Sequence, residues 1–270
     1  MTMDAKGSLA QRLDGSLSDE LARVQKEVRA APADPNLRTY LFQLLLLLGQ
    51  WKRALEQLQV CAQLSAKALP MAQTYREAIR CEVFRADVFA GKRAPQFLGE
   101  PFEWMGLLVQ ALQRLSAGDS AAARELRESA FEAAPTTPGS IDGADFEWIA
   151  DADSRLGPTC EAIVNGQYYW VPFARVRALR VDPPSDLRDL VWASAHLTLV
   201  NGGEHVALIP ARYAGTEAAH VDDLKLARRT EWVDVGGDAY TGLGQRMFAT
   251  QAGEYALLDV RDVRIDAAPP

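Results

Sequence analysis

Hydrophobic positions in the first half of the chain recur at the spacing of amphipathic helices. After Gly15, apolar side chains stand at Leu17, Leu21, Val24 and Val28, which are three or four residues apart. Similar apolar stripes, separated by glycine or proline, continue as far as Pro135. The pattern predicts helices over residues 17–31, 36–48, 51–66, 70–90, 101–116 and 119–134.

The glycines that separate these helices follow a repeat. Gly49 stands 34 residues after Gly15, which matches the tetratricopeptide period of about 34 residues. Gly118 starts a third unit that is one residue out of step, and Pro32 and Pro135 each lie seventeen residues after their glycine. We therefore expect an irregular, short tetratricopeptide-like array, whose concave face suits an extended or helical peptide.

The helix predicted over residues 36–48 supplies the candidate partner-binding residues. By analogy with tetratricopeptide geometry, the side chains facing the groove are Asn36, Thr39, Gln43, Leu46 and Leu47. The leucine run Leu44–Leu48 covers the whole circumference of this helix, whereas a surface helix normally has one polar side. We expect that Leu46 or Leu47 is exposed in the groove; the alternative is a helix buried all round.

Hydrophobic periodicity changes from helical to strand-like after the linker Thr136–Gly139. The predicted strands are Cys160–Val164, Gln167–Val171, Ala195–Val200, Glu204–Ile209, Thr230–Val235 and Tyr255–Val260. The turn pairs Asn165-Gly166 and Asn201-Gly202 indicate two hairpins. Residues 173–181 and 220–228 suit short helices, although the first also fits a strand.

These elements predict a two-part α+β fold. Residues 1–135 are expected to form a tetratricopeptide-like helical domain. Residues 136–270 are expected to form a mainly antiparallel α+β domain. Aromatic residues of the second part can pack on the first part or bind a partner, and packing between the parts is the preferred interpretation. These aromatics are Phe146, Trp148, Tyr168 and Trp170.

Charge and composition narrow the function classes. The formal net charge is −7, with the acidic excess in the second part, which argues against a nucleic-acid partner. The longest mostly apolar run, Tyr40–Leu48, is too short to span a bilayer, and Met1–Arg12 does not resemble a signal peptide. The three cysteines form no C-x-x-C pair, so reduced thiols are expected. We expect a cytoplasmic protein without membrane insertion.

An acidic segment is the strongest candidate for chemistry. Its carboxylates are Asp142, Asp145, Glu147, Asp151 and Asp153. Asp151-x-Asp153 is similar to the opening of a calcium loop, but Arg155 stands where a third ligand is needed. Helix and turn capping is the preferred interpretation, with no cofactor, no metal and no catalytic residue. The alternative is a metal-dependent enzyme or metal protein that uses the segment Asp142–Asp153.

The segment Ile141–Phe173 resembles the ImpE/TagJ family of type VI secretion. Supporting motifs are Asp186–Trp192, His196–Leu199 with Asn201-Gly202-Gly203, and Gly242–Met247. The resemblance implies a non-enzymatic accessory or adaptor protein of a bacterial type VI secretion system. It also implies binding of a helix of the small subunit of the contractile sheath, and a link to the AAA+ ATPase that recycles the sheath.

Overall fold

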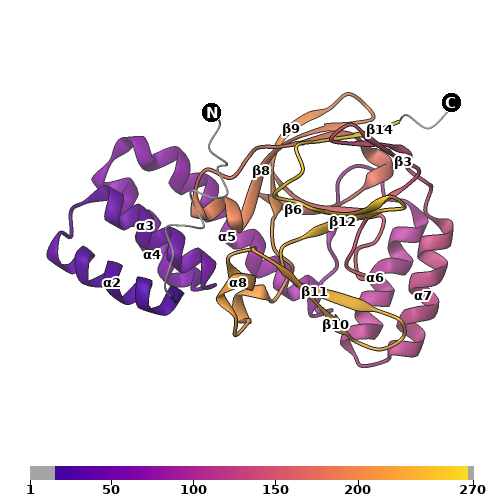
Figure 1. The fold of residues 1–270 in the computed structure, drawn as a ribbon, viewed down its shortest axis with the longest axis horizontal. Helices are drawn as coiled ribbons and strands as arrows, with labels where there is room; N and C mark the ends of the chain where they lie inside the picture. The colour runs from indigo at the N-terminus through magenta and orange to yellow at the C-terminus, as the bar shows by residue number, and fades with distance from the viewer. Residues whose placement is uncertain (1–15, 267–270) are drawn as a thin grey trace.

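The computed structural model describes residues 16–266 of the chain (Figure 1). Its helices are α2 (Leu17–Ala30), α3 (Pro35–Leu47), α4 (Trp51–Leu64), α5 (Leu69–Phe89), α6 (Glu103–Ser116), α7 (Ser120–Ala133) and the short α8 (Asp222–Lys225). All six helices predicted from periodicity are confirmed, with ends that shift by no more than two residues.

Local chemistry explains where the helices begin and end. The Asp34 side chain accepts hydrogen bonds from the backbone N–H groups of Asn36 and Leu37, which caps the start of α3. Gly49 has a φ of 63° and ends the same helix, in a backbone conformation that glycine adopts without steric cost. These signals involve only neighbouring residues, so they can be read from the sequence.

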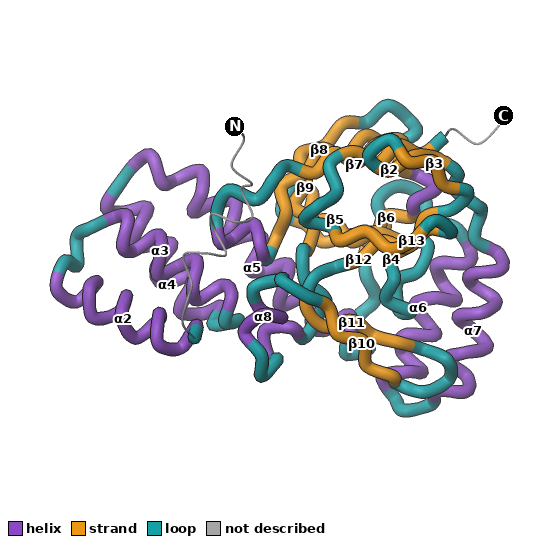
Figure 2. Tube along the Cα trace, viewed as in Figure 1, coloured by secondary structure: helices purple, strands orange, loops and turns teal. Residues whose placement is uncertain are grey.

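The helices form two groups on different sides of the β-sheet (Figures 1 and 2). Helices α2 to α5 pack on their sequence neighbours in one group, whereas α6 and α7 pair with each other at the opposite end of the molecule. Between the groups, the two-residue strand β1 (Gln96–Phe97) joins the sheet beside β6. The expected array is therefore split after α5.

The described residues form one nine-stranded sheet, a three-stranded sheet and a two-stranded ribbon. The order in the large sheet is β1-β6-β5-β9-β8-β7-β14-β2-β3. Its remaining strands are β2 (Gly139–Ile141), β3 (Ala144–Phe146), β5 (Thr159–Val164), β6 (Gln167–Pro172), β7 (Val176–Val181), β8 (Trp192–Leu199), β9 (Glu204–Pro210) and β14 (Asp262–Ile265). The smaller sheets contain β4 (Ile149–Asp151), β12 (Met247–Thr250) and β13 (Gly253–Ala256), and β10 (Thr230–Asp234) with β11 (Tyr240–Gly244).

Strand pairing is antiparallel throughout the described residues except between β1 and β6. The two-part α+β fold class is therefore confirmed. The strand predicted over Tyr255–Val260 is wrong beyond Ala256, because the buried residues Leu257 and Leu258 lie in a turn and the buried Val260 follows it outside any strand. Residues 173–181 form a 3-10 turn and strand β7 instead of a helix.

Buried apolar side chains form one continuous cluster that includes residues of both parts of the chain. The predicted boundary between residues 135 and 136 lies in the segment between α7 and β2. The division into two domains stays a prediction. In the described part of the chain, none of the helices combines the length and the apolar character needed to cross a membrane.

Candidate functional site

The inner face of helix α3, where partner binding was expected, is covered by the second part of the chain. The 3-10 helix η3 (Leu187–Leu190) packs against α3. Gln43 Nε2 donates a hydrogen bond to Asp186 Oδ1 at 3.2 Å. The Arg212 guanidinium donates to the carbonyl oxygen of Leu47 at 3.0 Å, which satisfies a helix-end carbonyl that has no partner within the helix. We call this contact area the closed face.

Leu46 and Leu47 are fully buried, with exposed fractions of 0%. The expectation that one of them is exposed is therefore wrong. Periodicity gave no sign of this cover, because it comes from residues more than 130 positions further along the chain. Gln43 is also buried, whereas Asn36 is exposed and Thr39 is partly exposed. Partner binding by this set of five residues stays a prediction, and only Asn36 and Thr39 present accessible surface for it.

Aromatic rings reinforce the closed face. Trp192, at the start of β8, lies 5.9 Å from the ring of Tyr75 and 6.1 Å from that of Trp51, measured between centroids. Its indole N–H donates to Glu82 Oε1 of α5 at 2.9 Å. The ring of Phe42 meets Tyr75 edge-on at 5.9 Å. Helices α4 and α5 thus both contact one tryptophan from the sheet, and α3 joins them through Phe42 on Tyr75.

A second surface of the same helical group is open. Helices α4 and α5 border a groove of about 800 Å³. Its apolar lining consists of Trp51, Leu55, Ile79, Val83 and Phe84. Val83 is 53% exposed, so its side chain is accessible to a partner in this groove. We call this surface the open groove.

Cationic side chains surround the apolar lining of the open groove: Lys52, Arg53, Arg80 and Arg93. Asp87 is the one acidic residue among the lining residues of this part of the structure. Arg93 lies 3.6 Å from Asp87 and stacks over the Phe84 ring at 5.5 Å, while Arg80 pairs with Glu77. An apolar floor with a basic rim suits an amphipathic helix that carries acidic residues beside its apolar stripe.

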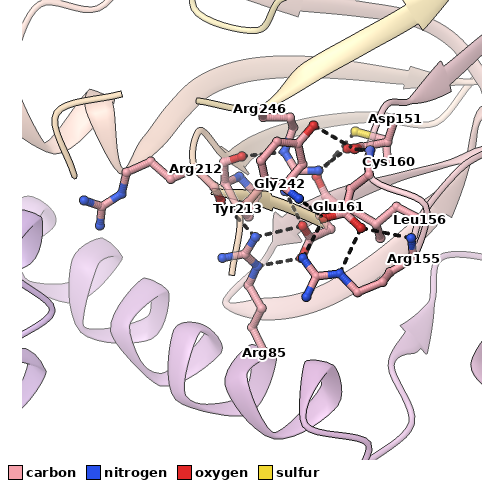
Figure 3. A network of polar contacts seen from close by, with 12 residues as sticks. Arg85, Asp151, Arg155, Leu156, Cys160, Glu161, Arg212, Tyr213, Gly242 and Arg246 are labelled. Carbon is pink, nitrogen blue, oxygen red and sulfur yellow. Dashed lines mark hydrogen bonds and ion pairs between the residues drawn. The ribbon is translucent and has the colours of Figure 1, made fainter. Parts of the chain in front are cut away.

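Charged side chains are buried where α5 meets the sheet (Figure 3). Arg85 of α5 donates from Nε to Glu161 Oε1 at 2.6 Å and from Nη2 to Glu161 Oε2 at 2.9 Å. Arg246, which lies between β11 and β12, pairs with the same carboxylate and with Asp151 of β4. We call Arg85, Asp151, Glu161 and Arg246 the buried polar network.

Each member of the buried polar network has further partners. Glu161 accepts a hydrogen bond from the Tyr168 hydroxyl, and Asp151 accepts one from Tyr213 at 3.2 Å. Burial opposes ionisation of Glu161, but the two guanidinium groups outweigh it and hold its pKa at about 2. With its charges paired and its side chains enclosed, the network holds α5 against the sheet.

The acidic segment divides between the surface and this interior. Asp142 Oδ1 accepts from the backbone N–H groups of Arg261 and Asp262, which belong to a distant part of the chain rather than to its own turn, and Asp145 and Glu147 are exposed. Asp151 and Asp153 are instead buried, and Asp153 pairs with Arg155 at 2.5 Å. Within residues 16–266 no group of three or more His, Cys, Asp or Glu side chains is placed to hold a metal ion.

The four aromatic residues singled out in the sequence occupy different environments. Tyr168 and Trp170 are buried against α5, with ring centroids 6.0 Å from Phe84 and 6.2 Å from Phe89. Phe146 is buried in the sheet. Trp148 is 39% exposed and lines a smaller cavity of about 440 Å³ at the end of α7.

Sequence patterns did not reveal the buried polar network or the open groove. One signal for the network was available: Glu161 is a carboxylate inside an apolar strand, and such a group requires a buried cationic partner. Its partners, Arg85 and Arg246, are distant in sequence. The sequence alone does not indicate which of the many arginines pair with Glu161. The open groove depends on which sides of α4 and α5 are left uncovered.

Comparison with known proteins identifies the family of this chain. The family model described as ImpE protein matches residues 143–264. The chain is 51% identical to the type VI secretion system accessory component TagJ of Pseudomonas aeruginosa, over 96% of this chain and 95% of that protein. The crystal structure of protein VPA1032 from Vibrio parahaemolyticus superimposes with a TM-score of 0.85, at 26% identity and 98% coverage of both chains. The chain therefore belongs to the ImpE family, and the accessory component TagJ is one of its relatives.

Proposed function

We propose that this protein is a non-enzymatic adaptor of a bacterial type VI secretion system, and that it binds a helix of the small sheath subunit. The relative that is 51% identical over most of the chain is named as an accessory component of that system. The sheath as ligand follows from the family resemblance. The buried polar network supports the absence of catalysis, because its carboxylates are enclosed and paired with arginine.

The observation that carries this proposal is the open groove between α4 and α5. It presents Trp51, Val83 and Phe84 beside exposed cations, and a helix with apolar residues at i, i+3 and i+4 matches such a surface. The closed face of α3 has no comparable free area, because η3 and Arg212 cover it. We therefore assign helix binding to the open groove.

The link to the sheath-recycling AAA+ ATPase forms a second part of the same proposal. An adaptor that holds a sheath subunit near the ATPase raises the effective concentration of substrate at the enzyme without contributing chemistry. We propose the cytoplasm as the compartment in which this protein would meet the ATPase, which follows from the family resemblance.

The experiment is calorimetric titration with a synthetic peptide that carries the helix of the sheath small subunit. Val83→Asp places a negative charge in the open groove, and we expect it to weaken binding by about thirtyfold, or about 2 kcal/mol, as for an interface hot spot. Because Val83 is exposed, the free energy of unfolding is expected to change by only about 0.5 kcal/mol.

A matched control is Val206→Asp, since Val206 is 72% exposed on β9 and lies outside the lining of the open groove. This variant should bind the peptide as tightly as the unchanged protein. If both variants bound the peptide with the same affinity, whether unchanged or weakened, the open groove would not be the binding site.

A further inference from the structure

The ribbon of β10 and β11 is the most exposed strand pair among the described residues. Strand β10 pairs only with β11, and the ribbon lies at the lower edge of the molecule in Figures 1 and 2. The second edge of β11 is covered, since Gly242 N donates to Asp153 Oδ2 and Ser154 N donates to the Tyr240 carbonyl oxygen. One edge of the ribbon, that of β10, therefore remains uncovered.

The hydrogen bonds at the two ends of the ribbon show which residues of β10 face outward. Gln245 N donates to the Arg229 carbonyl oxygen, and Val235 N donates to the Ala239 carbonyl oxygen, both at 3.0 Å. Because residues of an antiparallel strand alternate in the direction of their backbone groups, Glu231 and Val233 bond to β11 as well. The outward N–H and C=O groups belong to Thr230, Trp232 and Asp234.

Within residues 16–266, these outward backbone groups have no hydrogen-bond partner. Strand β10 contains neither proline nor lysine and no bulge, which are three of the usual protections of an edge strand, although it does carry two carboxylates. Both carboxylates have partners within the same chain: Glu231 pairs with Arg229, and Asp234 Oδ1 accepts a hydrogen bond from Gly236 N at 2.8 Å. Trp232 and Val233 remain 36% and 41% exposed.

We propose that β10 is a dimerisation edge that pairs antiparallel with β10 of a second copy of this chain, around a two-fold axis at Trp232. In that register, Trp232 faces Trp232 of the other copy, and Thr230 faces Asp234. Each outward residue then exchanges both backbone hydrogen bonds with a residue whose own groups point outward. The edge is self-complementary, as an isologous interface requires.

Side-chain charge is compatible with the same register. Glu231 of one copy stands opposite Val233 of the other, and Asp234 stands opposite Thr230, so no carboxylate directly faces another. The pairing extends the ribbon to four strands and shields the exposed side chains of Trp232 and Val233. Pairing of two five-residue strands buries little surface area. Stable interfaces of standard size bury about 1,200–2,000 Å², so we expect a weak dimer.

Two substitutions at Val233 test this register by sedimentation velocity from micromolar to high-micromolar protein. Val233→Glu places a carboxylate opposite Glu231 at both symmetric positions, and we expect dimerisation to weaken about tenfold or more (about 1.4 kcal/mol). Val233→Lys places an opposite charge there and should dimerise at least as tightly as the unchanged chain. Both variants replace the same exposed valine with a charged residue. Any effect on the stability of the ribbon that they share therefore cancels when their dimerisation constants are compared.

Amide hydrogen exchange supplies a second readout on the unchanged protein. The N–H groups of Thr230 and Trp232 should become protected as the concentration rises, whereas that of Val233 should be protected at every concentration. A monomer at all concentrations would overturn the proposal. Equal dimerisation of the glutamate and lysine variants, or unprotected Thr230 and Trp232 amides in a dimer, would also overturn it.

Discussion

The closed face of α3 and the open groove between α4 and α5 belong to the same helical group, but the first is covered by the chain itself and the second is accessible. Both present apolar side chains of adjacent helices. The closed face is covered by η3, Trp192 and Arg212 from the second part of the chain. The open groove keeps Val83 exposed and retains a basic rim. An apolar helix surface therefore indicates that something covers it, without indicating whether the cover is the same chain or a partner.

The comparison also shows what fixes the closed face in place. Trp192 donates to Glu82 of α5, and Arg85 of the same helix pairs with Glu161 in the sheet. Helix α5 thus bonds to the sheet on one side and borders the open groove on the other. Buried ion pairs, together with the packing of Phe84 and Phe89 on Tyr168 and Trp170, hold α5 in place, so we expect the shape of the open groove to depend on them.

The largest expected effect comes from breaking the buried polar network. Glu161→Gln leaves Arg85 and Arg246 buried without their shared carboxylate, and we expect a loss of about 4 kcal/mol in the free energy of unfolding. Denaturant unfolding measures this loss. The control Glu77→Gln removes a partly exposed ion pair with Arg80 and should cost about 0.5 kcal/mol or less. Similar small losses in both variants would show that the network does not fix α5.

A smaller loss is expected in the closed face itself. Leu47→Ala removes a fully buried side chain, and we expect a cost of about 3 kcal/mol from lost burial and the cavity that remains. The control is Leu64→Ala near the end of α4, where the side chain is 39% exposed and the loss should stay below about 1 kcal/mol. If Leu47→Ala unfolded at the same denaturant concentration as the unchanged protein, Leu47 would not be part of a packed interface.

The sequence predicted those features that depend on neighbouring residues. Helix ends follow from caps and glycines such as Asp34 and Gly49, and the hairpin of β5 and β6 follows from Asn165-Gly166. Strands such as β2 (Gly139–Ile141) and β4 (Ile149–Asp151) were missed because three residues are too few to show alternation.

Features that depend on distant residues could not be predicted in this way. The run Leu44–Leu48 was recognised as unusually apolar, but part of what covers its helix is distant in sequence: η3 packs on α3, and Arg212 bonds to the Leu47 carbonyl oxygen. Asp151 and Asp153 were identified as candidate turn carboxylates, yet Asp151 is paired with Arg246, 95 residues away. Which side chains are buried depends on the complete fold. Hydrophobic periodicity predicts burial only for a helix that has a polar side as well as an apolar one.

The most direct test of helix binding in the open groove is methyl NMR of the unchanged protein during titration with the sheath-helix peptide. We predict that the methyl signals of Leu55 and Val83 shift, because they line the open groove. The signals of Leu46 and Leu47 should stay in place, because the chain already encloses them. Shifts confined to Leu46 and Leu47, with Leu55 and Val83 unchanged, would contradict the assignment of the partner to the open groove.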